Sequence, residues 1–284
     1  GTVSWCKVTG NRNLRGVGGG IGVVGNGQAM IDHTIVSGNT APGNTASSVN
    51  IPCGAGIGVI ATGTSDAVEL TVDTCLVSDN ACGADVSGTG GGIYIRGYYV
   101  KTAVIRNTTV AGNTVSGVGG GLYMEGVFPK TTKISLENSV FAKNMVGEIE
   151  ENVNIVNDKY ACVTASYCFF GLESEKVGSG SSFGDPGFVG DGNYHLSAAL
   201  KLGYVTEESL QDLDGYGRTG ALDVGCYAFD GTTPPEPPVQ PIVLGTPAAR
   251  PSTDYNGSAV SVAFTGDIPD GAEVSAKITI GGVD

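Results

Sequence analysis

The chain has 284 residues, of which 47 are glycine without the Gly-X-Y period of collagen, and only 15% of its residues are charged. The net charge of −13 argues against a nucleic-acid partner, whose phosphates are bound by Lys and Arg, and no apolar run of about 18 residues predicts a membrane-spanning helix. A hydrophobic content of 40% is too high for a disordered chain, so a β-type protein with one large core remains.

A nine-residue pattern begins near the first residue and recurs along the chain. Its order is apolar, any, any, small, any, apolar, any, any, Asn. The copies span residues 3–11, 31–39, 72–80, 105–113 and 136–144, with a looser sixth copy from Val163 through Ser166 and Cys168. One such unit cannot bury its own apolar side, whereas stacked units bury it against one another. The pattern therefore predicts a solenoid in which Val8, Val36, Val77 and Val110 form one internal file.

Four glycine-rich triplets alternate with this pattern. They occupy residues 18–20, 54–56, 90–92 and 119–121. Each opens a short stretch with apolar residues at every second position, which is typical of a strand with one buried face. The alternation places Gly22, Gly58, Tyr94 and Tyr123 outward. We expect glycine to supply positive φ at the corners, and asparagine to adopt the left-handed bend and to bond along a stack of identical side chains.

The repeats of about 30 residues lack the Leu-rich consensus and helical period of leucine-rich repeats. They predict an all-β protein whose residues 1–230 form a right-handed parallel β-helix, a solenoid like that of pectate lyase. The Pro-rich residues 231–241 predict a stiff linker. Residues 242–284 alternate like strands, and we interpret them as the start of a truncated immunoglobulin-like segment or as a β tail packed on the solenoid.

Two further segments carry local expectations. Residues 145–160 are expected to form a loop or a short helix, and 197–212 is the best helical candidate. The first residues do not resemble a signal peptide, and we interpret the chain as a piece of a longer precursor. Among seven cysteines, Cys53 with Cys82 and Cys162 with Cys168 are placed for bridges, but sequence leaves the connectivity open.

Two sets of motifs resemble known surface proteins. Gly-Gly-Gly-Ile at 18–21 and 90–93, with Phe-Ala-Lys-Asn at 141–144, looks like the paired GGA[IL] and FxxN motifs of the chlamydial polymorphic-membrane-protein type of β-helix. The closing motifs at 185–189, 194–197, 212–218 and 223–227 are similar to the end of bacterial secreted β-helix proteins with variable surface anchors. This resemblance covers about residues 1–229. It implies a β-helix that is secreted or held at the bacterial cell surface.

One outward column contains charged residues. Ser4, Asp32, Asp73, Arg106 and Glu137 follow the first apolar position of successive copies, and stacking places them on successive coils. Lyases of the β-helix class hold Ca²⁺ with acids on such a face, beside a basic residue that takes a proton, so Asp32, Asp73, Arg106 and Glu137 are candidate catalytic residues. The alternative is a structural ladder of charge pairs. Apart from Ca²⁺ under the lyase hypothesis, the sequence predicts no cofactor and no metal site.

A second outward face carries aromatic residues. Its candidate ligand-binding residues are Tyr94, Tyr123, Arg96, Glu125, Tyr98 and Tyr99. Aromatic rings stack on sugar rings, and neighbouring Arg and Glu bond hydroxyl groups. The alternative is an aromatic cross-strand pair or a surface covered by a loop. Of the two histidines, His33 occupies a bend position and His195 lies in a closing motif, so both are interpreted as structural.

These observations predict a non-catalytic extracellular surface protein, adhesin-like or glycan-binding, whose partner is a polysaccharide or a cell-surface glycoconjugate. The alternative is a polysaccharide lyase or glycoside hydrolase that acts on an acidic polysaccharide along the outer face. The polygalacturonase signatures are absent, which disfavours the hydrolase. A purely structural spacer is the third hypothesis. No nucleic acid and no membrane-spanning segment are expected.

Overall fold

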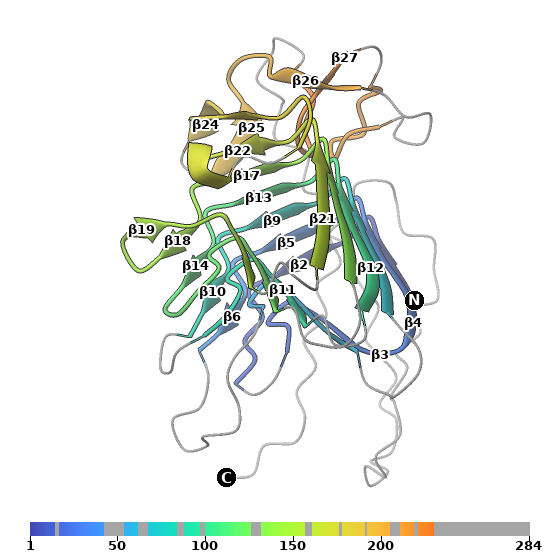
Figure 1. Cartoon of the computed structure of the whole chain (residues 1–284), viewed down its shortest axis with the longest axis vertical. Coiled ribbons are helices and arrows are strands. Elements are labelled where there is room, and N and C mark those ends of the chain that lie inside the picture. Colours follow the sequence, from blue (N-terminus) through green and yellow to red (C-terminus); the bar gives the residue numbers. More distant parts are fainter. Residues whose placement is uncertain are drawn as a thin grey trace, which may run out of the picture. The chain divides into compact units, whose positions relative to one another are not determined.

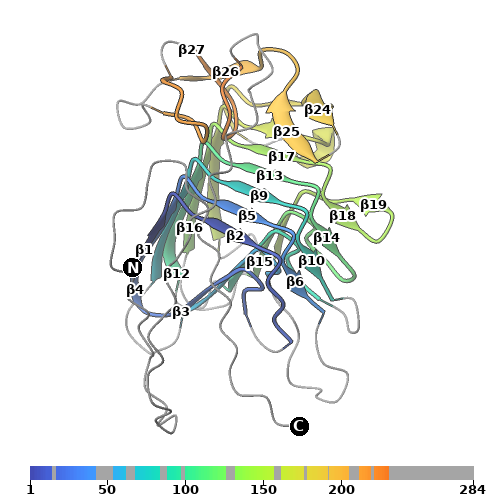
Figure 2. The ribbon, with the colours of Figure 1, turned by 180° about the vertical axis from the view of Figure 1, so that it is seen from behind.

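A computed structural model describes residues 1–14, 17–42, 54–61, 68–83, 88–96, 100–125, 132–156, 161–175, 178–190, 192–204, 211–218 and 221–229. These residues are almost entirely β-structure, and the single helix among them is the short 3-10 helix η1 (Glu173–Glu175). Most strands belong to four sheets, which we name A to D. Figures 1 and 2 show the strands of these sheets as parallel rungs that follow the chain from blue to yellow. The linker and the β segment expected at 231–241 and 242–284 lie outside the described residues.

The strands enter the sheets in a fixed order. Sheet A contains β1 (Thr2–Ser4), β4 (Gly27–Asp32), β8 (Val68–Asp73), β12 (Val100–Arg106), β16 (Thr132–Glu137) and β21 (Ala161–Ser166). Sheet B contains β2 (Lys7–Thr9), β5 (Ile35–Ser37), β9 (Leu76–Ser78), β13 (Thr109–Ala111), β17 (Val140–Ala142), β22 (Phe169–Phe170) and β23 (Ser182–Phe183). Sheet C contains β6 (Thr40–Ala41), β10 (Ala81–Cys82), β14 (Thr114–Val115), β18 (Met145–Val146) and β19 (Ile149–Glu150). Sheet D contains β3 (Ile21–Gly25), β7 (Ile57–Ala61), β11 (Ile93–Arg96), β15 (Leu122–Glu125) and β20 (Val153–Val156).

From β4 to β18, each repeat therefore adds one strand to sheets A, B, C and D in turn. Each strand pairs in parallel with its counterpart in the neighbouring repeats, and the antiparallel pair β18–β19 is an exception within sheet C. The sequence expectation of an all-β chain with parallel sheets is confirmed.

The expected internal file is present in sheet B. Val8, Val36, Val77 and Val110 are paired in register, and Phe141 continues the file. The last four of these side chains are 0% exposed. A second file in sheet A joins the first apolar position of every copy, including Ile31, Val72, Ile105 and Leu136. Both files belong to one apolar core, so the nine-residue pattern identified core positions correctly.

The sixth copy of the pattern was placed two residues too early. The sequence interpretation took Val163 as its first apolar residue, but Val163 pairs with Ile134, and Ala165 pairs with Leu136. The second apolar position is accordingly Phe170, which pairs with Phe141. An error of two residues keeps Val163 and Cys168 at core positions, because side chains alternate with a period of two. Ser166, expected at the small inward position, instead pairs with Glu137 in the outward column.

The first bend of each repeat leads from sheet A to sheet B. Its left-handed residue is Trp5, His33, Thr74, Asn107, Asn138 or Tyr167, with φ between 41° and 54°. The next residue is Cys, Thr or Ser, and its side chain donates to the carbonyl two residues earlier, as in Thr108 Oγ1 to Arg106 O at 2.8 Å. Where this residue is Thr or Ser, its side-chain oxygen also accepts a backbone N–H from the preceding repeat, as in Cys75 N to Thr108 Oγ1 at 3.3 Å. Because these hydrogen bonds end on backbone groups, the bend forms with several residue types at its left-handed position.

The second bend, from sheet B to sheet C, carries the asparagine that ends each of the five full copies of the pattern. Its left-handed residue is the one before the asparagine, namely Gly10, Gly38, Asp79, Gly112 or Lys143. The expectation that the asparagine itself adopts the left-handed bend is therefore wrong. Each asparagine instead donates through Nδ2 to Oδ1 of the next one, over 2.8–3.0 Å, from Asn11 through Asn39, Asn80 and Asn113 to Asn144. We call this row the asparagine ladder.

The asparagine ladder ends on a carboxylate. Asn144 Nδ2 donates to Asn152 Oδ1 at 3.0 Å, and Asn152 Nδ2 donates to Glu175 Oε2 at 2.9 Å. The backbone N–H of Asn152 donates to Glu175 Oε1 at 2.6 Å. Burial raises the pKa of Glu175 above its ordinary value, against the opposing effect of these hydrogen bonds.

The third glycine of a triplet is required by the ladder. A Cβ at Gly92 would lie 2.7 Å from Gly121 O and 2.9 Å from Asn113 Nδ2. Comparable contacts surround Gly20, Gly56 and Gly121. A side chain at this position would push the ladder amide away from its partners, so the triplets leave room for the backbone and the asparagine to approach each other.

The described residues between 185 and 229 form a closing segment that covers the outer face of sheet B. It contains two antiparallel pairs, β24 (Phe188–Gly190) with β25 (Asn193–Leu196) and β26 (Lys201–Tyr204) with β27 (Ala221–Asp223). Val224 packs with Val140 and Phe169 of sheet B, and Cys226 and Tyr227 pack with Leu76. The backbone N–H of Gly225 donates to Asn138 O at 2.7 Å. Sheet B is thus buried on both faces over its central strands.

Three local expectations are corrected. Residues 145–156 form strands β18, β19 and β20 in place of a loop or helix. The helical candidate 197–212 contains strand β26, and residues 205–210 lie outside the described part. Cys168 is a free buried thiol whose pKa is raised by burial to about 12, so the local bridge with Cys162 is wrong. Cys53, the partner suggested for Cys82, lies outside the described residues.

Candidate functional site

The charged column of sheet A is stacked as expected. Ser4, Asp32, Asp73, Arg106 and Glu137 are paired one after another in the parallel register. The column continues to Ser166 of β21. An apolar residue precedes each member of the column. Because that residue is buried in the core, the next side chain along the strand occupies the outer face.

Asp73 is the most constrained member of the column. Its Oδ2 accepts a hydrogen bond from Arg106 Nε at 2.7 Å, and its Oδ1 accepts from Asn107 Nδ2 at 2.9 Å and from Thr74 Oγ1 at 3.1 Å. The side chain of Asp73 is 6% exposed, and that of Arg106 is 22% exposed. Both carboxylate oxygens are therefore occupied by protein donors in a nearly buried ion pair.

The closing segment brings a second guanidinium to this region. Arg218 is 3% exposed, and its Nη2 donates to Gly225 O at 2.7 Å. Burial lowers the pKa of Arg218, and the carboxylates of Asp212, Asp223 and Asp73 oppose this effect. The electrostatic interaction of Arg218 with Asp73 was not predicted, because nothing in the closing motifs indicates which sheet they cover.

At the other end of the column, Asp32 contacts the first bend. Asp32 Oδ1 lies 2.7 Å from His33 Nδ1, and Asp32 Oδ2 accepts a hydrogen bond from Ser4 Oγ at 3.0 Å. The ring of His33 stacks on Trp5 with 4.2 Å between ring centroids. The second histidine, His195, bonds Asp214 at 2.8 Å and stacks on Tyr227 within the closing segment. Each histidine is therefore held by an acid and an aromatic ring, as a structural side chain would be.

Sheet D brings together four of the six predicted ligand-binding residues. Tyr94 pairs with Tyr123 and Arg96 pairs with Glu125 across β11 and β15, and the two tyrosine rings stack with centroids 6.0 Å apart. Tyr94 donates its hydroxyl to Glu125 Oε2 at 3.0 Å. The other two residues, Tyr98 and Tyr99, lie outside the described part of the chain.

The exposure of these four side chains is unequal. Tyr94 is on the outer side of its strand, as the alternation predicts, but it is only 4% exposed. Tyr123 is half-buried, whereas the side chains of Arg96 and Glu125 are 49% and 41% exposed. Tyr94 therefore holds Glu125 through its hydroxyl, and the more accessible of the four side chains are those of Tyr123, Arg96 and Glu125. We call these three residues the sheet D patch.

Comparison with protein-family models, with curated proteins and with solved structures finds no match for this chain. Among the described residues, no group of three or more His, Cys, Asp and Glu side chains is placed to hold a metal ion. In the same part of the chain, no helix combines the length and apolar character needed to cross a bilayer.

Proposed function

We propose that residues 1–229 form a right-handed parallel β-helix of a secreted or surface-held bacterial protein that binds a polysaccharide or glycoconjugate without catalysis. The fixed order in which strands enter sheets A to D supports the β-helix, because a chain that winds in one direction visits its sheets in a constant sequence. The asparagine ladder supports a rigid array of repeats. The resemblance of the repeat and closing motifs to bacterial surface β-helices supports the location.

The sheet D patch carries the binding proposal. It offers one aromatic ring beside a cation and an anion on adjacent parallel strands. Arg96 Nε and Glu125 Oε2 form an ion pair at 3.9 Å, and both side chains are more than 40% exposed, so they can bond sugar hydroxyls at neighbouring positions. The ring of Tyr123 supplies an apolar face for a pyranose. The stacked Tyr94 restricts the motion of the Tyr123 ring, which lowers the entropy cost of binding.

A glycan array followed by calorimetry tests this proposal. We expect Tyr123→Ala to weaken binding of the best glycan by about tenfold, because a ring–sugar contact is lost. Tyr216→Ala is the matched control, since Tyr216 is 43% exposed in the closing segment, away from the patch. An array without ligands, or equal loss in both variants, would leave the structural spacer as the better hypothesis.

The lyase or hydrolase alternative is less well supported. Its candidates Asp32, Asp73, Arg106 and Glu137 are stacked, but both oxygens of Asp73 are occupied by protein donors and the Asp73–Arg106 pair is nearly buried. A substrate uronate would have to displace these hydrogen bonds. Incubation with uronate polymers and Ca²⁺, read by the ultraviolet absorbance of the unsaturated product, tests this alternative. Activity that disappears in Asp73→Ala and Arg106→Ala would overturn the non-catalytic proposal.

A further inference from the structure

The connection from sheet D to sheet A in the first repeat is a single residue. Strand β3 ends at Gly25 and β4 begins at Gly27, so Asn26 alone joins them. In the next repeat a longer segment separates β7 from β8. Gly25 pairs with Ala61 and Gly27 pairs with Val68, so both ends of the short connection are fixed to neighbouring strands. The first repeat therefore makes this turn with no spare residue.

Asn26 is exposed, and no hydrogen bond holds its side chain among the described residues. In the same part of the chain, Gly27 forms none outside the pairing of β4 with β8. Gly25 and Gly27 have φ of 131° and 101°, which favour glycine. A Cβ built at either glycine would meet nothing within 4 Å. No other group therefore crowds the main chain on either side of Asn26.

An asparagine followed by glycine holds an electrophile and a nucleophile within one short stretch of chain. The backbone nitrogen of Gly27 reaches Cγ of Asn26 by rotation about the bonds between them, and the absence of a Cβ on Gly27 leaves the approach open. Because both groups belong to the same chain, the reaction is intramolecular and needs no enzyme.

The reaction consumes only water. The bond from Gly27 N to Asn26 Cγ forms, the Cγ–Nδ2 bond breaks, and Nδ2 leaves as ammonia with the proton that Gly27 N loses. The product is a succinimide ring. Water opens this ring at Cγ to give aspartate, or at the main-chain carbonyl of residue 26 to give isoaspartate. In isoaspartate the main chain runs through Cβ and Cγ, so it is longer by one atom.

The asparagine ladder shows how the fold protects the same side chain elsewhere. Asn80 is 0% exposed, and its Nδ2 donates to Val36 O and to Asn113 Oδ1, both at 2.9 Å. The nitrogen of the next residue is held as well, because Ala81 N donates to Asn39 O at 2.9 Å. Succinimide formation at Asn80 would break all of these hydrogen bonds inside the core.

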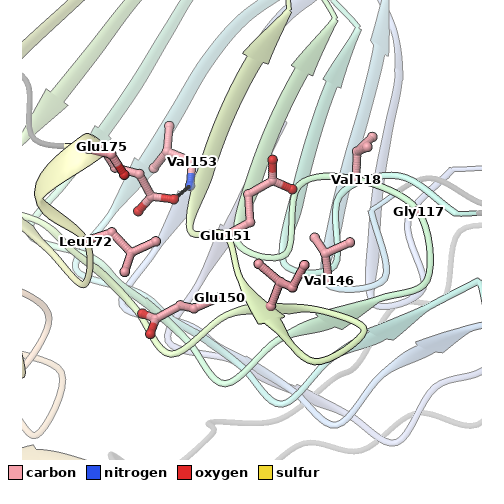
Figure 3. A pocket seen from close by; sticks show the side chains of 10 residues that line it. Gly117, Val118, Val146, Glu150, Glu151, Val153, Leu172 and Glu175 are labelled. Carbon is pink, nitrogen blue, oxygen red and sulfur yellow. Dashed lines mark hydrogen bonds between the residues drawn. The ribbon is translucent and has the colours of Figure 1, made fainter.

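The end of the ladder is protected in a similar way. Asn152 Nδ2 donates to Glu150 Oε1 and to Glu175 Oε2, both at 2.9 Å. The nitrogen that follows Asn152 is that of Val153, and it donates to Glu175 Oε1 at 3.3 Å. Figure 3 shows this contact beside the pocket between the β18–β19 hairpin and η1. Asn26 has none of these restraints.

We propose that Asn26 is a site of spontaneous deamidation, and that isoaspartate at this position is a modified form of the protein. The additional main-chain atom lengthens a connection whose two ends are fixed in register. The resulting strain loosens the start of β4. The sheet D patch belongs to β11 and β15, so the proposal does not depend on glycan binding.

Incubation of the folded chain at mildly alkaline pH, followed by peptide mass spectrometry, tests the proposal. We expect the Asn26 peptide to gain the mass of an exchange of NH2 for OH. A protein isoaspartyl methyltransferase should label the product. The reference is the same chain unfolded in guanidinium chloride. Asn26 should react in the folded chain at a rate within about tenfold of the unfolded rate, whereas Asn80 should react only when unfolded.

Two variants separate the parts of the proposal. Asn26→Gln should abolish the mass gain at this site, because the longer side chain closes a less favourable ring. Asn26→Asp carries the new charge on a main chain of normal length. Hydrogen exchange at the start of β4 should be about tenfold faster in the isoaspartyl form than in Asn26→Asp. Circular dichroism checks that both variants fold.

Three results would overturn the proposal. The first is that Asn26 in the folded chain is as stable as Asn80. The second is that the mass gain at this peptide persists in Asn26→Gln. The third is equal hydrogen exchange in the isoaspartyl form and in Asn26→Asp, which would remove the effect on β4. A second Asn-Gly pair, Asn256–Gly257, lies outside the described residues, and peptide mapping measures it separately.

Discussion

The two bends of each repeat solve the same geometric problem differently. At the first bend, residues as unlike as Trp5, His33 and Asn107 share a left-handed conformation, and a Thr, Ser or Cys side chain bonds the backbone nearby. At the second bend, the same amide recurs in the first five copies, because each asparagine bonds to the asparagines of its neighbours. A bend closed by backbone bonds accepts substitution, whereas one closed by a chain of identical side chains requires identity.

The largest expected effect is at the middle of the asparagine ladder. Asn80→Leu removes the acceptor for Asn39 and the donor to Val36 O and Asn113 Oδ1, all within the buried core. We expect the free energy of unfolding to fall by about 3–5 kcal/mol, because several buried polar groups lose their partners at once. Urea denaturation measures this loss.

The matched substitution at the first bend is Thr108→Cys. Cys75 and Cys168 already occupy this position in other repeats, and each donates to the equivalent carbonyl of its own repeat, two residues earlier. We expect a change of less than about 1 kcal/mol. A loss as large as that of Asn80→Leu would contradict the distinction between the two bends.

An intermediate effect of opposite sign is expected at the left-handed residue of the first bend. Thr74 has φ 49°, which is unfavourable for a β-branched side chain. Thr74→Asn should raise the free energy of unfolding by about 0.5–1 kcal/mol, because asparagine adopts this conformation more readily. Thermal denaturation measures the gain. The same change at Thr34, which is not left-handed and is 0% exposed, should be destabilising. If Thr74→Asn were destabilising too, backbone conformation would not govern this bend.

The smallest effect concerns the acid that ends the ladder. The pKa of Glu175 is raised in the folded protein by burial above its ordinary value of 4.5, so the folded state binds more protons than the unfolded state just above that pH. The stability contributed by this group is present below about pH 4 and is lost as pH rises toward the folded pKa. Glu175→Gln should therefore reduce the fall in melting temperature as the pH rises from about 4.5 through the raised pKa of Glu175. Glu173→Gln, an exposed change in the same 3-10 helix, should not reduce it.

The internal files and the stacked charged column were predictable because each repeat carries its own copy of the signal. Val36, Val77 and Val110 share one spacing to an asparagine, and that spacing determines the register. The sixth copy has no asparagine at the end of the pattern, so only apolar residues remained to align it, and two frames fit equally well. The end of the ladder was also hidden, because Asn152 and Glu175 reach it through a hairpin and η1 without any period.

The candidate sites were predictable only in their positions along the strands. Alternation placed Tyr94 and Asp73 on outer faces, but exposure depends on what covers those faces. Asp73 interacts electrostatically with Arg218, which lies in a segment more than 100 residues later in the chain.

The direction of the asparagine ladder has an electrical consequence. Along the ladder from Asn11 to Asn152, each amide donates one Nδ2–H toward the carboxyl-terminal repeats and accepts through Oδ1 from the repeat before it, so the amide dipoles add head to tail as peptide dipoles do in an α-helix. The positive end of this row meets the carboxylate of Glu175. The row therefore has a head and a tail, and a repeat inserted anywhere along it must keep its amide facing the same way.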